Sequence, residues 1–144
     1  MRRTLSFLSL LVLLGAGLDG RAAAAETTTI ALDDFSYADT SAEPTDQSAA
    51  HDRRLQAFMV ALRRDIAADP RYRLAPQEGA AFKVIGGIQK TSTLVQWAKV
   101  AVIDVGARKV VMDKLYTFRG DNDESWERAE IFVSREVMAA LAQP

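Results

Sequence analysis

Residues 94–118 have the sequence LVQWAKVAVIDVGARKVVMDKLYTF. Two long runs within it, 94–104 and 109–118, are rich in the β-branched and aromatic residues that favour strands. The residues between them, 105–108, have turn chemistry, so we expect a β-hairpin. Apolar residues occupy both alternating phases of the runs, as at 100–103, which predicts that the hairpin is buried on both faces over part of its length.

Upstream of the hairpin, the sequence predicts a strand followed by a helix. Residues 29–35, TIALDDF, favour the strand, and residues 36–48, rich in Ser, Thr, Asp and Pro, favour a loop. Apolar side chains then recur at intervals of three and four positions from 49 to 68, which indicates an amphipathic helix. Proline disfavours helical geometry in the residue before it, so the helix should end before Pro70.

Two further strands are predicted at 71–74 and 82–89. The Gly86-Gly87 pair inside the second of them indicates a bulge or a close approach by another part of the chain. After the hairpin, a final amphipathic helix is predicted at 124–141, because its apolar residues share one helical face. An Asn-Asp pair directly before this helix supplies a residue suited to capping it.

These elements predict an α/β fold of the α+β type, with a single mixed sheet of about five strands and two main helices in the approximate order β-α-β-β-β-β-α. The first strand, the first helix and strand 71–74 should form a right-handed parallel unit. Only seven residues separate strand 71–74 from strand 82–89, whereas a parallel crossover needs about a dozen or more. We therefore expect these two strands not to be connected in parallel.

Residues 1–25 have the order of a secretory signal peptide. Arg2 and Arg3 give a positive start, a short apolar run follows, and an A-x-A pattern at 23–25 precedes Glu26. The apolar run has about 14 residues, fewer than the roughly 20 of a spanning helix. The tandem arginines also fit a twin-arginine export signal. We expect cleavage after residue 25, a single domain at 26–144, a soluble product in the periplasm or outside the cell, and no membrane anchor after cleavage.

The composition does not favour a highly charged partner. Without the leader the chain has 15 basic and 18 acidic residues, a net charge of −3, which gives no electrostatic case for nucleic acid or an anionic membrane. Because the sequence contains no cysteine, disulfides, thiol chemistry and Cys-ligated zinc are excluded. We expect no cofactor, and the oligomeric state stays open.

The sequence contains no evident catalytic constellation, so we expect a protein that is not an enzyme. His51, the single histidine, lies near a predicted helix start, where an exposed or capping role is expected. Asp33 and Asp34 end the first strand, where open α/β sheets place ligands, and form a candidate polar site. Hydrogen bonding to the following loop explains the same two residues. A hydrolase that uses Asp33 or Asp34 is a third hypothesis for the function.

Two other segments are candidate binding sites. Gln89, Lys90, Thr91 and Ser92 lie between two predicted strands and form either a binding loop or a solvated turn.

An acidic cluster precedes the final helix. Asp121, Asp123 and Glu124 carry the oxygen ligands that hard cations prefer, which makes them candidates for a metal site. Their spacing is not that of an EF-hand, and capping of the helix explains the same residues.

Several segments resemble a family of predicted secreted bacterial proteins of unknown function. They are DDF at 33–35, DTS at 39–41, GGIQKTS at 86–92 and FRGDNDESW at 118–126. In layout the chain is also similar to the N-terminal domain of TolB and to CsgG-like envelope proteins, which share an opening strand ending in Asp-Phe, an amphipathic helix and a late hairpin. The chain departs from these relatives in lacking the cysteine of many CsgG-like lipoproteins and in having no room for a second helix at 75–81. The resemblance implies binding or assembly work in the cell envelope and no catalytic residues.

Two main functions therefore remain open. The first is a non-catalytic periplasmic or secreted accessory module of the cell envelope that binds a protein or peptide partner. The alternative is a small-ligand or cation-binding accessory protein of a periplasmic oxidation pathway, served by the polar segment 89–93 and the acidic segment 121–124.

Overall fold

The computed structural model describes residues 26–143, and the predicted leader at 1–25 lies outside the described residues. The described chain forms one six-stranded sheet and two long helices, which confirms the predicted class, a mixed sheet with two main helices. In chain order the elements are β1 (Thr28–Leu32), β2 (Ser36–Asp39), α1 (Ser48–Ala68), β3 (Tyr72–Leu74), β4 (Phe82–Lys90), β5 (Val95–Asp104), β6 (Lys109–Arg119) and α2 (Asp123–Leu141).

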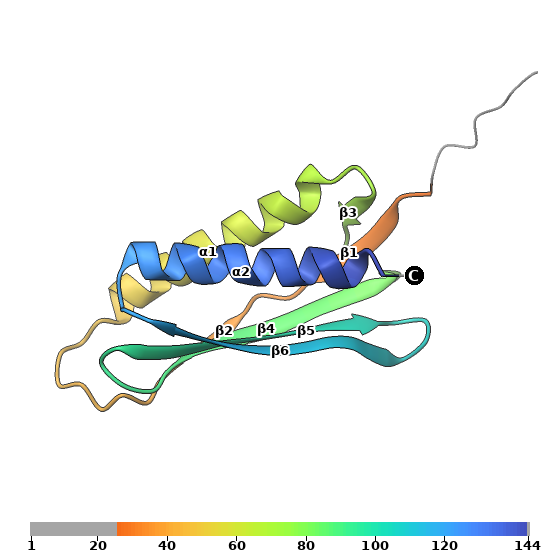
Figure 1. Ribbon diagram of the computed structural model, residues 1–144. Coiled ribbons are helices and arrows are strands. Elements are labelled where there is room, and N and C mark those ends of the chain that lie inside the picture. Colours follow the sequence, from red (N-terminus) through yellow and green to blue (C-terminus); the bar gives the residue numbers. More distant parts are fainter. Residues whose placement is uncertain (1–25, 144) are drawn as a thin grey trace, which may run out of the picture.

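Both helices lie against the same face of the sheet (Figure 1). The alternation of a strand brings every second side chain of β5 to that face, where Val100 and Val102 are almost fully buried. Each helix contributes an apolar stripe to the same core, represented by Leu62 of α1 and Val133 of α2, both fully buried. Neither helix within residues 26–143 combines the length and hydropathy that a membrane-crossing helix needs.

The strand order is β3-β1-β4-β5-β6, and β2 pairs with the second half of β4. Because β1 pairs in parallel with both β3 and β4, these two strands run in the same direction, and the prediction that residues 75–81 are too few for such a connection is wrong. Ile30 is opposite Leu74 on one side and Phe82 on the other. Since β4 begins at the level where β3 ends, the connection only steps sideways past β1. The sheet is nevertheless mixed, because β4, β5 and β6 are antiparallel.

The predicted first strand, 29–35, is divided in the structure. β1 ends at Leu32, and the chain then forms β2, which pairs in parallel with β4 in a region predicted to be a loop. Between the two strands the ring of Phe35 packs onto Gly86, where a Cβ would lie 2.5 Å from the ring atom Cζ. A Cβ there would also lie 2.6 Å from the backbone oxygen of Lys99, so the close backbone approach predicted from the Gly86-Gly87 pair is confirmed.

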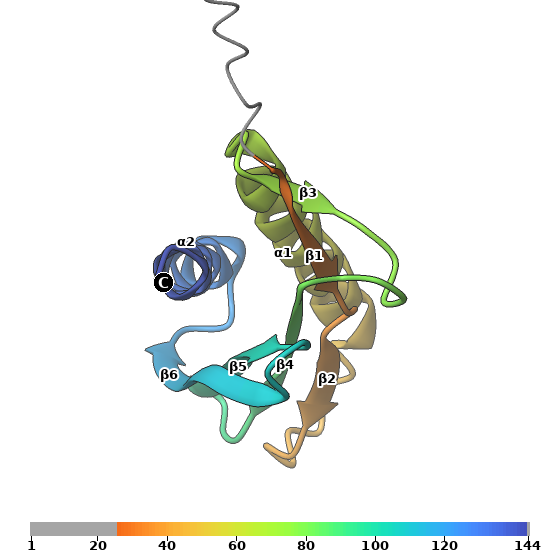
Figure 2. The same ribbon diagram turned by 90° about the vertical axis from the view of Figure 1, so that its right-hand side faces the viewer.

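One face of the hairpin is covered and the other is not. Buried and more exposed residues alternate along β5, and on the face away from the helices Trp97 is 38% exposed and Leu115 is 57% exposed. The prediction that the hairpin is buried on both faces is therefore wrong for the described chain. The reason is that α1 and α2 pack on the same side, which leaves the second apolar phase of β5 and β6 open (Figure 2).

Candidate functional site

Charged and polar side chains replace apolar ones at one end of the core. Lys90 of β4 and Gln96 of β5 are directly paired in the sheet, point toward the helices and have no exposed surface. Burying such groups is costly unless they are hydrogen-bonded. Lys90 Nζ and Gln96 Nε2 both have close partners, whereas Gln96 Oε1 has none among the described residues. We use the name polar cluster for the side chains of Glu43, His51, Arg54, Lys90, Gln96 and Asp121.

Asp121 is the centre of the polar cluster. Its Oδ2 atom lies 2.8 Å from His51 Nε2 and 2.6 Å from Lys90 Nζ. Its Oδ1 atom lies 2.9 Å from Arg54 Nη1 and 3.3 Å from Gln96 Nε2. Four side chains from three elements therefore converge on one carboxylate, whose own exposure is 9%.

The loop before α2 places this carboxylate. Gly120 has a φ of +98°, a left-handed conformation that glycine adopts at little cost, and its carbonyl accepts from Gln96 Nε2 at 2.8 Å. Asn122 then begins α2 with a reciprocal cap, because its side chain accepts from Ser125 N at 2.9 Å while Ser125 Oγ accepts from Asn122 N at 3.2 Å. The position of Asp121 is thus fixed by a turn and a helix start on either side of it.

The electrostatics of the polar cluster favour the charged forms. Burial acts against the charge of Lys90, but its hydrogen bonds to Asp121 and Glu43 outweigh burial and raise its pKa. Burial likewise acts against the ionised Asp121, yet the donors Lys90 and His51 hold the pKa of this carboxyl below its usual value. Burial and the nearby carboxylates, Asp39 first, raise the pKa of Tyr37, whose ring lies 4.7 Å from the His51 ring.

The polar cluster holds elements together, and its central carboxylate has no free oxygen atom. A general base or nucleophile must reach a substrate with an unoccupied atom, and both oxygens of Asp121 are already occupied by protein donors. The cluster ties the chain before α1, α1 itself, the β4–β5 end of the sheet and the loop before α2 to one another.

The structure divides the predicted binding loop. Lys90 belongs to the polar cluster, whereas Gln89 Nε2 donates to Thr40 Oγ1 at 3.2 Å near the surface. Thr91 Oγ1 donates to the carbonyl of Val95, and Ser92 Oγ accepts from the backbone N–H of the same residue. Three of the four side chains therefore stabilise the strand end and the turn between β4 and β5.

The three candidate metal ligands, Asp121, Asp123 and Glu124, have different roles in the structure. Asp121 is the centre of the polar cluster, Asp123 is 93% exposed and accepts from Arg54 Nε at 2.8 Å, and Glu124 pairs with Arg128 at 2.6 Å. Within residues 26–143 no group of three or more acidic or histidine side chains is arranged to hold a metal ion.

Asp33 and Asp34 follow β1 and point to different partners. Asp33 is 3.1 Å from Lys83 Nζ and accepts from Gln77 Nε2 at 2.7 Å, while Asp34 pairs with Arg63 of α1. The two carboxylates therefore bind separate parts of the chain.

The sequence analysis missed most of the polar cluster. His51 was expected to be exposed or capping, but it is only 2% exposed and contacts Asp121, so that expectation is wrong. Glu43 and Arg54 gave no signal in the sequence. Lys90 did give one, because it continues the inward phase of β4 after Val84 and Ile88.

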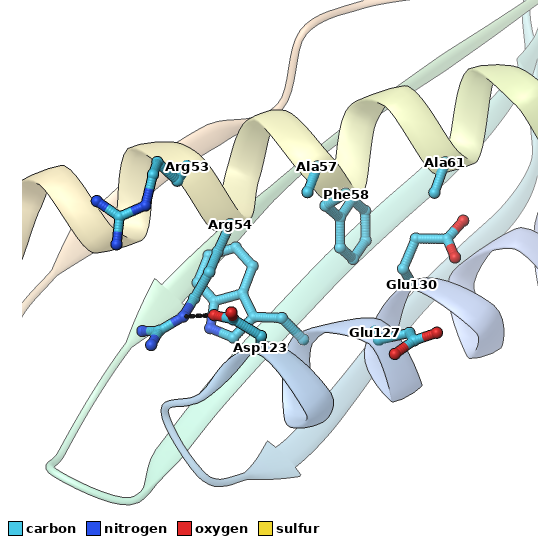
Figure 3. A pocket seen from close by; sticks show the side chains of 9 residues that line it. Arg53, Arg54, Ala57, Phe58, Ala61, Asp123, Glu127 and Glu130 are labelled. Atoms are coloured by element: carbon cyan, nitrogen blue, oxygen red, sulfur yellow. Dashed lines mark hydrogen bonds and ion pairs between the residues drawn. The ribbon is translucent and has the colours of Figure 1, made fainter.

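A pocket of about 420 Å³ opens between α1 and α2, and we call it the interhelical pocket (Figure 3). Phe58 and Trp126 line it, and Ala57 and Ala61 leave room along α1. Glu130 reaches into it from α2 toward Ala61 (Figure 3). This carboxyl is 3% exposed, and its Oε1 atom has no hydrogen-bond partner among the described residues.

The comparisons with known proteins agree with the fold. A family model described as "Protein of unknown function (DUF2380)" matches residues 71–137. No curated protein matches the chain in sequence. Among solved structures, the chain is similar to TolB from Acinetobacter baumannii at 13% identity and a TM-score of 0.54, over 81% of this chain and 29% of that one. The chain thus spans less than a third of the length of TolB.

Two further structures show lower similarity. The PelC dodecamer from Paraburkholderia phytofirmans matches at 17% identity and a TM-score of 0.47, over 84% of this chain and 94% of that one. Lipoprotein GNA1162 from Neisseria meningitidis matches at 8% identity and a TM-score of 0.44, over 78% and 99%. The family match and the similarity to TolB confirm the predicted resemblance to an uncharacterised family with a TolB-like layout.

Proposed function

We propose that this protein is an exported, non-catalytic accessory module of the cell envelope and that it binds an extended segment of another protein along β6. The observation that carries the proposal is an uncovered apolar strand at the edge of the sheet. The occupation of both Asp121 oxygens by protein donors supports the non-catalytic part, and the signal-like leader supports export.

β6 is the last strand in the sheet order, and no other strand of residues 26–143 pairs with its outer edge. Such an edge presents unpaired N–H and C=O groups, to which an extended segment can add as a further strand. β6 is 11 residues long, and Val110 and Leu115 are 55% and 57% exposed on it. Its length and its apolar side chains favour a partner segment over water at this edge.

A hollow of about 630 Å³ lies on the open face of the sheet, mainly over β2, β4 and β5, and reaches β6 at Leu115. Its lining includes Ile85, Trp97, Ala101 and Leu115, which come from three neighbouring strands. Every second side chain of a strand added to β6 would point toward this face. An apolar side chain of the bound segment can therefore pack against Leu115, at the side of the hollow nearest to β6.

The charges of β6 indicate the kind of segment that fits. Lys109, Lys114 and Arg119 give the strand three positive charges, and Asp113 gives it a single negative one. Opposite charges on directly paired strands are favourable and like charges are not. A segment that alternates apolar and acidic residues is therefore the best match, whereas a second copy of β6 would add more basic side chains to the same edge.

The proposal can be tested by photo-crosslinking in the native bacterium. A photoreactive phenylalanine at position 97 should give a discrete adduct with a second protein, and peptide mapping should place the crosslink in an extended acidic-apolar segment. The adduct should be lost when Leu115→Lys is added. Val60→Lys is the matched control, because Val60 is 60% exposed but lies on α1, and the adduct should persist in it.

Two results would contradict the proposal. An adduct that is unaffected by Leu115→Lys would place the partner elsewhere, and an adduct of twice the chain's own mass would identify a second copy as the occupant. Absence of any adduct at position 97 would argue against binding at this face.

A further inference from the structure

The interhelical pocket contains an ionisable group that the fold does not use. Glu130 is 3% exposed, and none of the described side chains donates to its Oε1 atom. A buried carboxyl without a donor is costly, because it gains no hydrogen bond in place of water. Burial first, and then the neighbouring carboxylates of Asp65 and Glu127, raise the pKa of Glu130 to about 7.

The cationic side chains around the pocket are engaged with other groups. Arg54 is held by Asp121 and Asp123, both within 2.9 Å. Arg64 is held by Asp65, whose other oxygen accepts from a serine of α2. The part of the pocket around Glu130 is therefore left with an excess of negative charge.

The opposite end of the pocket has a different character. Arg53 lies there, away from Glu130 (Figure 3), and its Nη1 atom donates to the carbonyl of Ala49 at 3.1 Å. Between the two ends, Phe58 and Trp126 line the pocket, each with only 2% of its surface left uncovered by the protein. Aromatic faces attract organic cations, and a volume of about 420 Å³ is within the range of small-ligand sites.

We propose that the interhelical pocket binds a small organic ammonium ion, with an N–H of the ligand donating to Glu130 and its apolar body lying against Phe58 and Trp126. A bare metal ion is disfavoured, because no group of acidic and histidine side chains in residues 26–143 is arranged to hold one. A neutral apolar molecule would leave the carboxyl of Glu130 without a donor. The proposal concerns a different surface from the β6 edge and does not depend on it.

The test uses Trp126 as its reporter. The sequence contains two tryptophans, so Trp97→Phe leaves Trp126 as the single tryptophan, which can be excited selectively at 295 nm. Trp97 is partly exposed on the far side of the sheet. Titration with phenethylamine at pH 8 should change the emission in a saturable way, whereas 2-phenylethanol and phenylacetate should not. Affinity should be about tenfold weaker or more at pH 5.5, because the carboxyl is then protonated.

A lysine-like probe distinguishes two sources of the ammonium group. N-acetyl-lysine methylamide stands for a lysine side chain of a partner protein. Weak binding of this probe beside tight binding of phenethylamine supports a free small amine. Equal binding of the two supports an ammonium site that a partner's lysine also fills.

Glu130→Gln keeps the shape of the side chain and removes its charge, so it should abolish the response to phenethylamine. Glu124→Gln is the matched control, because Glu124 is on the same helix but is exposed and paired with Arg128. Binding that survives Glu130→Gln, or equal binding of the amine and the alcohol, would overturn the proposal. If Glu130→Gln does not fold, the proposal is tested on the protein that retains Glu130. The two measurements are then the comparison of the amine with the alcohol and the pH dependence of amine binding.

Discussion

At the scale of single residues, Lys90 should matter most to stability. It is fully buried between the carboxylates of Asp121 and Glu43. Lys90→Met keeps most of the volume but leaves both carboxylates without their shared donor. Removing one partner of a buried ion pair costs about 3–5 kcal/mol, so we expect the free energy of unfolding to fall by about that much in urea denaturation followed by circular dichroism.

Lys99→Met is the control for this prediction. Lys99 is on the next strand, is 65% exposed and lies 3.7 Å from Asp113. Exposed ion pairs contribute about 0–1 kcal/mol, so this change should be nearly silent. Equal losses in the two variants would show that the buried pairs of Lys90 contribute no more than a surface contact.

Glu130 should make stability depend on pH in the opposite direction from an ordinary paired carboxylate. Its pKa is about 7 in the folded protein against an ordinary value of 4.5. Between these values the folded chain binds more protons than the unfolded chain, so this contribution to stability is complete below pH 4.5 and is lost as pH rises through 7. Glu130→Gln stays neutral, and should be about 3 kcal/mol more stable than the unchanged protein at pH 8 and nearly equal to it near pH 4.

The measurement is thermal or urea unfolding across that pH range without added amine. Glu124→Gln should leave the pH dependence as it is, because Glu124 is exposed and paired on the surface. A difference between Glu130→Gln and the unchanged protein that stays constant from pH 4 to 8 would contradict the assignment of this pH dependence to Glu130.

At the scale of elements, the chain around the start of β2 packs closely against β4 at Gly86 and Gly87. We expect Gly86 to tolerate a side chain less well than Gly87. A Cβ at Gly86 would lie 2.5 Å from the Phe35 ring and 2.6 Å from the carbonyl oxygen of Lys99. At Gly87 it would lie 2.6 Å from the Ser36 hydroxyl, which can rotate away. Overpacking of this kind costs about 1–3 kcal/mol, so Gly86→Ala should lower the urea midpoint clearly more than Gly87→Ala. The reverse order would show that Phe35 moves more easily than Ser36.

Most elements could be predicted from the sequence because their periodicity is local. The two helices and the hairpin each repeat an apolar pattern over many residues, and the capping of α2 by Asn122 follows from its position. The arrangement of β1, β3 and β4 could not be predicted in this way. β3 contains three residues, and nothing in the local pattern states that it stops where β4 starts. β2 was missed for a similar reason, since its pairing with β4 depends on Gly86 and Phe35 being close in space.

At the scale of the whole molecule, the candidate sites depend on contacts between residues that are far apart in the sequence, which local patterns do not predict. Asp121 was singled out for its charge, but its partners come from segments 31 and 70 residues away, Lys90 and His51. The acidic segment 121–124 therefore predicted a bound cation, whereas in the fold the side chains of Lys90 and Arg54 supply positive charge to Asp121. Glu130 could not be recognised, because a glutamate on a helix is usually solvated and only the packing of α1 against α2 buries it.

The proposed export of the whole chain directs the choice of a partner, and it can be tested at the leader. The A-x-A pattern at 23–25 predicts a mature chain that begins at Glu26, two residues before β1. Full-length protein with a C-terminal tag, recovered from the periplasm of a bacterial host, should therefore have Glu26 as its N-terminus by intact-mass analysis. Ala24→Leu changes the variable position and should still give Glu26, whereas Ala25→Leu should shift or block cleavage, because signal peptidase requires a small residue there. Recovery of the unchanged protein with residues 1–25 attached, in the cytosol, would contradict export and remove the envelope as the source of the β6 partner.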